Sequence, residues 1–513
     1  MQRTGWKEAV VYQVYPVSFR DSDGDGLGDL AGITEKLDYL VELGVSVVWI
    51  CPFFRSPWVD NGYDISDYRD IDPRFGSMAD FGRLLSEMHR RGLKLLMDLV
   101  VNHCSDRHPW FTEARKSRDN NYRDYFLWRD PKPDGSPPNN WTSYFSGPAW
   151  TFDEATGQFY LHLFTKEMPD LNWENPALRR EIHDILRFWL DKGVDGFRLD
   201  SMHAYGKAAG LPDGDPSEGP PVGIEHFSSL PRTHGYIREM HREVFSRYGI
   251  LTVGETDGVT VEDALQYTAE ASGEVNMVFQ FQHMDLDAAG GNRLLADGPV
   301  PVRKLKACLS DWQRGLMNRG WNSLYLSNHD QPRQVSRFGD DGVYREVSAK
   351  MLATILHLQQ GTPYVYQGEE LGMTNRRIES LEEVRDVESL NAYRDLVGRG
   401  LVTPGRMLEA IRRRGRDNAR TPMQWDGSVH AGFTSGTPWI GVNPNYRDIN
   451  AEAQRKDPDS VFQYYRKLIA LRRAHPVAVY GDFTELCADS GQVFAFVRRL
   501  EETALLVVAN LAR

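Results

Sequence analysis

The stretch Gly193-Val194-Asp195-Gly196-Phe197-Arg198-Leu199-Asp200 joins a short apolar run to two charged residues. The run predicts a buried strand, and Arg198 and Asp200 share one side of it because side chains alternate along an extended chain. An ionised aspartate that leaves an apolar strand costs roughly several kcal/mol unless it is paired or reaches a cleft. We therefore expect Asp200 to be a reactive carboxylate held by Arg198, and a structural Asp–Arg pair is the alternative.

Length and composition indicate a large globular protein. A chain of 513 residues suggests roughly two to three domains, and 41% hydrophobic with 26% charged residues favours neither disorder nor a membrane protein. The net charge of -12 argues against general nucleic-acid binding and favours a neutral or cationic ligand. The four cysteines lack metal-site spacing, and we expect reduced thiols, no membrane span and a cytoplasmic location.

Eight short apolar runs predict eight strands. They are residues 10–16, 45–51, 93–101, 196–199, 250–254, 275–281, 324–327 and 362–366. Amphipathic stretches that predict helices lie between most of them, for example 78–91, 176–191, 235–248 and 343–360. Eight strands with intervening helices predict an α/β fold, the (β/α)₈ TIM barrel.

Two further segments depart from the barrel pattern. Residues 104–174 follow the third strand and are rich in Asn, Pro and aromatic residues, so we expect a small inserted domain over the barrel mouth. Residues 477–513 contain three alternating strand runs and predict a partial, apparently shortened all-β C-terminal domain. The catalytic barrel would then comprise residues 1–103 and 175–476, with a second long, charged connection at 379–426.

Polar residues end four of the predicted strands, where barrel enzymes place their active sites. They are Asp98, Asn102 and His103 after the third strand, Arg198 and Asp200 after the fourth, Glu255 after the fifth, and His329 and Asp330 after the seventh. No Cys or His arrangement has zinc spacing, so acid/base and nucleophilic catalysis is favoured over metal hydrolysis. Crowded carboxylates push their pKa values apart, which lets one act as nucleophile and another as acid, as glycoside hydrolysis requires.

Residues 98–103, 196–200, 254–255 and 328–330 resemble the four signature regions of the alpha-amylase family of retaining glycoside hydrolases, in the family's order. The resemblance implies that Asp200 is the nucleophile, Glu255 the general acid/base, and Asp330 the stabiliser of the transition state. By the same resemblance, His103 and His329 would hydrogen-bond the first glucose, and Arg198 would orient Asp200.

Other segments resemble the oligo-1,6-glucosidase and α-glucosidase subgroup. Tyr63 and Asp64 resemble a platform in which the tyrosine stacks on the sugar and the aspartate binds its non-reducing end. Arg416 matches an arginine that pairs with that aspartate in exo-acting enzymes, and Phe164 matches an aromatic of the first subsite. Judged without the resemblance, Asp64 would cap a loop, Arg416 would be a surface charge, and Phe164 a core aromatic.

The residue after the predicted nucleophile indicates which glycosidic bond the enzyme prefers. In the subgroup it is typically valine in enzymes that prefer α-1,6 bonds, whereas here it is Ser201. A serine leaves more room beside the leaving group, which favours α-1,4 substrates. An oligo-1,6-glucosidase, a sucrose isomerase or glucosyltransferase, and a non-catalytic scaffold of the same superfamily are the alternatives to an α-glucosidase acting on short oligosaccharides.

The loop after the first strand is the metal candidate. Alternating Asp and Gly residues offer oxygen ligands to a hard cation, although no Glu follows at the twelfth position of an EF-hand loop. The resemblance implies a structural calcium or magnesium bound by Asp21, Asp23, Asp25, the carbonyl of Leu27, and Asp29. An empty Asp/Gly turn is the alternative.

Overall fold

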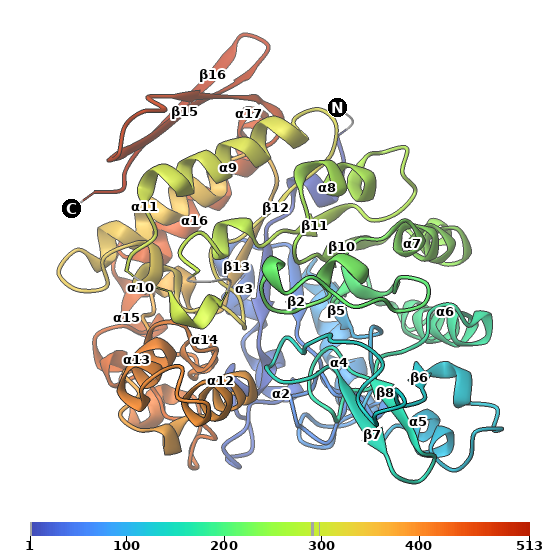
Figure 1. The fold of residues 1–513 in the computed structure, drawn as a ribbon. Coiled ribbons are helices and arrows are strands. Elements are labelled where there is room, and N and C mark those ends of the chain that lie inside the picture. The colour runs from blue at the N-terminus through green and yellow to red at the C-terminus, as the bar shows by residue number, and fades with distance from the viewer. Residues whose placement is uncertain (1–2, 289–291, 297, 513) are drawn as a thin grey trace.

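The computed structural model describes residues 3–288, 292–296 and 298–512, with eight parallel strands at its centre. They are β1 (Val11–Val14), β2 (Val47–Ile50), β5 (Lys94–Leu99), β9 (Gly196–Leu199), β10 (Leu251–Glu255), β11 (Met277–Phe279), β12 (Ser323–Leu324) and β13 (Thr362–Tyr366). Their order is β11-β10-β9-β5-β2-β1-β13-β12, and a parallel bridge between Val278 and Asn322 joins the outer strands. The predicted barrel is confirmed (Figure 1), and the strand bounds overlap every predicted run.

Strand register places the charged residues of the barrel side by side. Asp98 of β5 pairs with Arg198 of β9, and β9 pairs in turn with β10, which ends at Glu255. Strand β9 is buried along its whole length, as expected of a parallel strand covered on both faces. The carboxylates of three neighbouring strands therefore meet at one end of the barrel.

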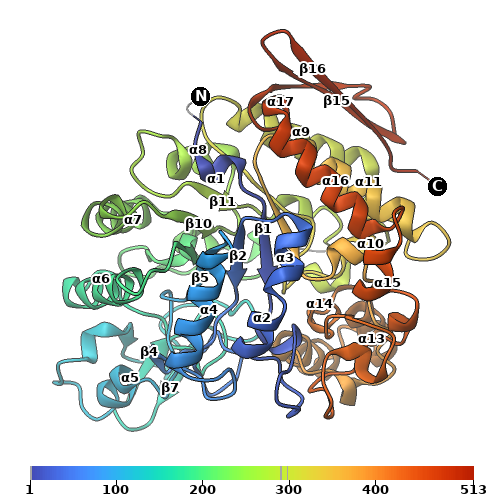
Figure 2. The same ribbon diagram turned by 180° about the vertical axis from the view of Figure 1, so that it is seen from behind.

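Helices cover the outside of the barrel. The main ones are α3 (Leu37–Leu43), α4 (Met78–Arg90), α6 (Pro176–Leu190), α7 (Pro231–Glu243), α8 (Val261–Thr268), α9 (Val302–Leu316), α11 (Arg345–Leu358) and α16 (Val461–Ala474). Helix α4 begins at a capping box of Ser77 and Asp80, and its buried face packs toward the strands (Figure 2). Helix α7 starts four residues before the predicted 235, because Pro231 is favoured in the first turn.

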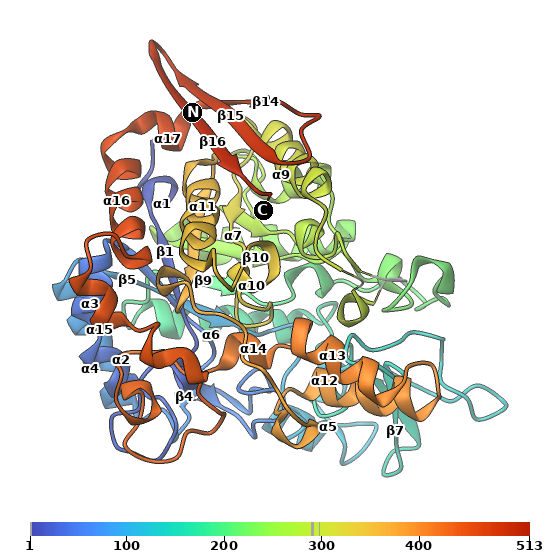
Figure 3. The same cartoon turned by 90° about the vertical axis from the view of Figure 1, so that its left-hand side faces the viewer.

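Two long connections flank the same end of the molecule. The segment after β5 contains α5 (Pro109–Ala114) and a three-stranded antiparallel sheet in the order β6-β8-β7, formed by β6 (Trp128–Arg129), β8 (Gln158–Leu161) and β7 (Trp150–Asp153). The connection after β13 contains α12 (Val387–Ala392), α13 (Pro404–Arg414) and α14 (Asp417–Arg420). Both lie at the end opposite the C-terminal sheet (Figure 3).

The C-terminal sheet has the three strands that the sequence predicts. They are β14 (Asp482–Leu486), β15 (Val493–Leu500) and β16 (Thr503–Asn510), paired antiparallel in that order. Among the described residues, none of the helices has the length and apolarity that a membrane span requires.

Candidate active site

Arg198 joins the carboxylates of three strands. Its Nη1 donates to Oδ1 of Asp98 at 2.8 Å and to Oδ1 of Asp200 at 2.5 Å, while Nη2 contacts Oε1 of Glu255 at 2.6 Å. The Arg198 side chain is 1% exposed, so water screens these contacts little. Arg198 therefore holds Asp200 and Glu255 side by side on adjacent nitrogens.

Asp200 and Glu255 have raised pKa values. Burial raises the pKa of Asp200 to about 6, against the opposing charge of Arg198. Burial also raises the pKa of Glu255 to about 7, helped by the nearby charges of Asp200 and Asp330. The pair can thus hold one proton near neutral pH, which is the state that a nucleophile and an acid need.

The surroundings of Asp330 lower its pKa, whereas those of Asp200 and Glu255 raise theirs. Burial would raise its pKa, but His329, Arg416 and Arg420 outweigh that effect and hold the pKa well below its usual range. Its Oδ2 lies 2.9 Å from Nε2 of His329, and its Oδ1 accepts from Arg420 at 2.9 Å and from Arg416 at 3.2 Å. Asp330 is therefore a fixed negative charge in the cavity.

Eight of the predicted residues line one cavity beside this cluster: Tyr63, His103, Phe164, Asp200, Ser201, Glu255, Asp330 and Arg416. The rings of His103 and Phe164 pack with centroids 5.0 Å apart, and burial lowers the pKa of His103 to about 4. The site has a neutral imidazole and aromatic rings next to its carboxylates, a combination suited to a sugar with polar edges and apolar faces.

His329 lies behind the cavity wall. Its ring stacks on Tyr63 with centroids 5.1 Å apart, Nε2 contacts the Tyr63 hydroxyl at 2.6 Å, and the amide of Gln13 contacts Nδ1 at 2.9 Å. Although burial disfavours the charged ring, Asp330 raises the pKa of His329 to about 10. Both ring nitrogens have protein partners, so direct contact of His329 with glucose stays a prediction.

The predicted pairing of Arg416 with Asp64 is wrong, because Arg416 pairs with Asp60. Nη2 of Arg416 lies 2.8 Å from Oδ1 of Asp60, which lines the cavity. Asp64 is fully buried and accepts from the backbone N–H groups of Val59 and Asp60 at 2.9 and 3.1 Å. Burial raises the pKa of Asp64 to about 6. Asp64 therefore caps the loop, as its residue type alone suggested, and Asp60 is a wall residue that the sequence pattern did not reveal.

Ser201 adopts a left-handed backbone conformation directly after Asp200. Its φ is 44° and its ψ is 37°, and its backbone N–H donates to Oε2 of Glu255 at 3.0 Å. The sharp turn directs the chain away from β9 and leaves the Ser201 side chain at the cavity. Ser201 therefore lines the cavity between Asp200 and Glu255.

Lys207 is a second residue that sequence reasoning missed. Its buried ammonium contacts Oδ2 of Asp170 at 2.6 Å and donates to the Asn102 side-chain oxygen at 3.0 Å. Asp170 belongs to the long segment after β5 and forms a β-bridge with His103. Through its contacts with Asp170 and Asn102, Lys207 therefore links that segment to the barrel next to the cavity. A lone lysine in a loop carries no sequence signal of this role.

The predicted metal loop brings three of its carboxylates together. Possible ligand atoms of Asp21, Asp23 and Asp29 all lie within 4.8 Å of one another. Asp25 instead accepts from the N–H of Leu27 at 2.8 Å and is exposed. Three carboxylates suit a hard cation, so these residues fit a calcium or magnesium ion, with Asp25 outside the cluster.

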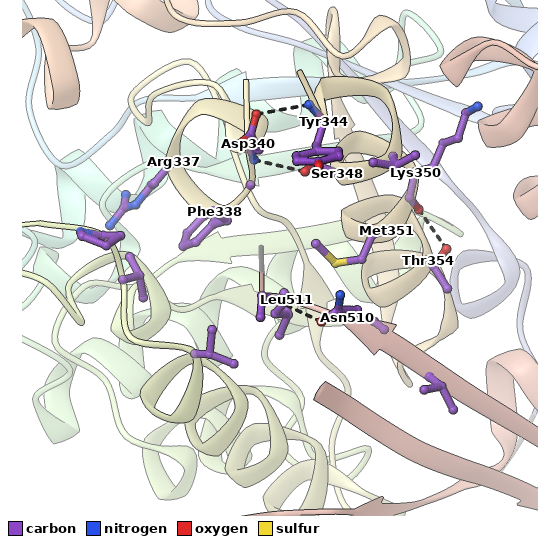
Figure 4. A pocket seen from close by; sticks show the side chains of 18 of the residues that line it. Arg337, Phe338, Asp340, Tyr344, Ser348, Lys350, Met351, Thr354, Asn510 and Leu511 are labelled. Carbon is purple, nitrogen blue, oxygen red and sulfur yellow. Dashed lines mark hydrogen bonds between the residues drawn. The ribbon is translucent and has the colours of Figure 1, made fainter. Parts of the chain in front are cut away.

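A larger cavity of about 1140 Å³ lies away from the carboxylates, between α11 and the end of β16. Figure 4 shows Phe338, Tyr344, Met351 and Leu511 among the side chains around it. Asp340 accepts from the backbone N–H of Tyr344 there, and none of the predicted catalytic residues lines the cavity. The chemistry therefore belongs to the smaller cavity at the strand ends.

Comparisons with known proteins agree with this geometry. The family model described as "Alpha amylase, catalytic domain" matches residues 13–481. An oligo-1,6-glucosidase of Parageobacillus thermoglucosidasius is 57% identical over 512 residues, which cover 99% of this chain and 91% of that protein. An α-glucosidase of Pediococcus pentosaceus is 53% identical over 490 residues, covering 95% and 88%.

A solved structure has a very similar fold. A mutant isomaltulose synthase of Erwinia rhapontici NX5 in complex with sucrose has a TM-score of 0.96 and 45% identity, covering 100% of this chain and 91% of that one. Because the family model spans most of the chain and the carboxylates meet at the strand ends, the chain belongs to the alpha-amylase family and is a glycoside hydrolase of its α-glucosidase and oligo-1,6-glucosidase subgroup.

Proposed function

We propose that this chain is a retaining, exo-acting α-glucosidase that releases terminal non-reducing glucose from short α-linked oligosaccharides. The observation that carries the proposal is the binding of Asp200 and Glu255 to adjacent nitrogens of Arg198. Two carboxyl groups side by side are compatible with the separation of about 5–5.5 Å in retaining enzymes, whereas inverting enzymes need room for a water molecule between them.

The proposed reaction follows from the protonation states of Asp200 and Glu255. Ionised Asp200 attacks the anomeric carbon while Glu255 donates its proton to the glycosidic oxygen, so the C–O bond breaks and a β-glucosyl ester forms. Glu255, now ionised, takes a proton from water, which attacks the ester and releases α-glucose. Asp330, kept ionised by His329, Arg416 and Arg420, stabilises positive charge on the sugar ring in both transition states.

The Asp60–Arg416 pair supports exo action. Arg416 also contacts Oδ1 of Asp386 at 2.7 Å and lies over the ring of Phe145, 4.7 Å from its centroid. A guanidinium held from several sides closes one end of the cavity to a longer chain and leaves hydrogen-bonding groups for a terminal glucose.

The position of Ser201 supports a preference for α-1,4 over α-1,6 bonds, because its small side chain lies at the cavity next to Glu255. The second candidate is an oligo-1,6-glucosidase, the activity for which the P. thermoglucosidasius relative is named. Transfer of glucose to a sugar, as in sucrose isomerisation, is a third outcome of the same intermediate, favoured by the likeness to the isomaltulose synthase.

We also propose that Asp21, Asp23 and Asp29 hold a structural calcium or magnesium ion. None of the three lines the catalytic cavity, so the ion would stabilise the loop after β1 and take no part in bond cleavage.

The test is a product analysis with maltose, isomaltose, sucrose and starch, with NMR to follow the anomer released. Release of α-glucose from maltose, faster than from isomaltose and with starch nearly untouched, is the expected result. Faster cleavage of isomaltose would overturn the linkage preference, and β-glucose as the first product would overturn the retaining mechanism.

A further inference from the structure

Asp257 lies on the loop that directly follows Glu255, the last residue of β10. Between Glu255 and Asp257, buried Thr256 donates its N–H and its hydroxyl to the carbonyl of Phe279 at 3.0 and 2.8 Å. This anchor fixes the loop to β11, and both flanking carboxylates line the catalytic cavity. Asp257 is therefore placed on the leaving-group side, two residues beyond the group that protonates the leaving oxygen.

Neighbouring polar groups hold both the backbone and the side chain of Asp257 by hydrogen bonds. Its N–H donates to Nδ1 of His203 at 3.3 Å, its carbonyl accepts from the Ser228 hydroxyl at 3.0 Å, and its Oδ1 accepts from the N–H of Gly258 at 2.9 Å. Burial lowers the pKa of His203, so this ring adds no positive charge beside Asp257. Within the described part of the chain, no lysine or arginine forms an ion pair with Asp257.

The arginines that line the cavity are already paired with carboxylates. Among the described lining residues, these arginines are Arg293 and Arg416. Nε and Nη2 of Arg293 donate to the two carboxylate oxygens of Glu388 at 2.8 and 2.7 Å, and Arg416 contacts Asp60 and Asp386. The acidic groups Asp60, Asp200, Glu255, Asp257 and Asp330 line the same cavity. An anionic group bound there would meet carboxylates without an unpaired cation to balance it.

We propose that Asp257 sets the charge preference of the leaving-group side: neutral and cationic leaving groups are accepted, and anionic ones, including phosphorylated sugars, are repelled. The inference rests on the proposed function, because it requires a leaving group beside Glu255. One carboxylate roughly 7 Å from a charged leaving group, in a partly solvated site, changes kcat/KM by about tenfold.

The test uses three α-glucosides whose phenols have similar acidity but different charge: 4-(hydroxymethyl)phenyl, 4-carboxyphenyl and 4-(aminomethyl)phenyl. For the wild type we expect kcat/KM to fall from the cationic to the neutral to the anionic glucoside, by about a hundredfold overall, which is about tenfold per step. Asp257→Asn, which keeps an oxygen for the N–H of Gly258, should reduce that ratio about a hundredfold, to near one, because the Asp257 charge accounts for the tenfold change at each step. Glu262→Gln, an exposed carboxylate on α8, removes the same charge outside the cavity and should leave the ratio unchanged.

Three results separate the possible failures. Hydrolysis of all three glucosides at equal kcat/KM by the wild type would overturn the inference while the α-glucosidase function stands. An unchanged ratio in Asp257→Asn would show that Asp257 does not set the preference. Absence of hydrolysis of the neutral glucoside by the wild type would instead overturn the proposed function. If Asp257→Asn does not fold, added NaCl replaces it, because screening should shrink the wild-type ratio, and a salt-independent ratio overturns the inference.

Discussion

Replacement of Arg198 by methionine tests how the catalytic carboxylates are held. The substitution keeps an unbranched apolar side chain but removes the cation that contacts Asp98, Asp200 and Glu255 at 2.5–2.8 Å. Loss of one partner from a buried ionic cluster costs about 3–5 kcal/mol. If transition-state stabilisation falls by a similar amount, kcat/KM falls by roughly 10²–10⁴-fold.

The pH dependence provides the sharper readout. Arg198 lowers the pKa values of both Asp200 and Glu255, which are about 6 and about 7 in its presence, so its removal raises both. Because the nucleophile must be ionised, the acid limb of kcat/KM should move to higher pH. Both proteins lose stability equally between about pH 4 and pH 6, where these carboxyls are protonated in either folded state but ionise on unfolding. The deficit in thermal stability of Arg198→Met relative to wild type should therefore grow as the pH rises above about 6, through the wild-type pKa values toward the higher ones of the variant.

The assay is kcat/KM for 4-nitrophenyl α-glucoside between about pH 5 and pH 9, with thermal unfolding over the same range. Arg198→Lys is the control, because one ammonium retains the charge but lacks the fork that joins Asp200 to Glu255. It should show a smaller pH shift than Arg198→Met. An acid limb that stays in place in Arg198→Met, with a loss in kcat/KM of less than about tenfold, would refute the reasoning.

Four further substitutions or treatments address other parts of the account. Glu255→Gln should lower kcat/KM for maltose by about 10²–10⁴-fold but affect α-glucosyl fluoride far less, because fluoride leaves without a proton; steady-state kinetics on both compounds provide the comparison. Ser201→Val should raise the ratio of isomaltose to maltose cleavage, and urea denaturation should show a loss of about 1 kcal/mol because a β-branched residue is strained at a φ of 44°. Lys207→Met should lower the unfolding temperature and raise KM for maltose, because Asp170 keeps a buried charge without its cation next to His103. A chelator should lower the unfolding temperature measured by calorimetry but leave kcat at 25 °C unchanged, because Asp21, Asp23 and Asp29 lie outside the cavity.

Each of these expectations has a contradicting result. Equal losses on maltose and glucosyl fluoride would argue against Glu255 as the acid, and an unchanged substrate ratio would remove Ser201 from the linkage argument. A Lys207→Met variant as stable as the wild type would show that Asp170 does not depend on this cation. An unfolding temperature insensitive to the chelator would indicate a loop without a metal.

The barrel is predictable because its strands are short apolar runs with glycine or polar residues at their ends. Once the strands are assigned, their carboxyl ends must meet, so the residue pattern alone places Asp200, Glu255 and Asp330 near one another. The structure adds that Arg198 is the shared partner of the first two. That contact depends on register across two strand pairs, which a residue pattern does not specify.

The loop after β2 shows what the sequence could not provide. Asn61 and Gly62 have φ values of 49° and 105°, and this turn directs Asp64 inward and leaves Asp60 at the cavity. The Asp-Asn-Gly sequence of residues 60–62 signals a turn, but the direction of each flanking carboxylate depends on its type. The error in assigning the partner of Arg416 follows from that ambiguity.

The measurement that tests the central claim most directly is covalent trapping of the nucleophile. Wild-type protein incubated with 5-fluoro-α-D-glucosyl fluoride, digested and examined by mass spectrometry should carry the sugar on Asp200, and Asp200→Ala should remain folded but unlabelled and inactive. A label on another residue, or wild-type turnover by Asp200→Ala, would contradict the assignment of Asp200 as the nucleophile.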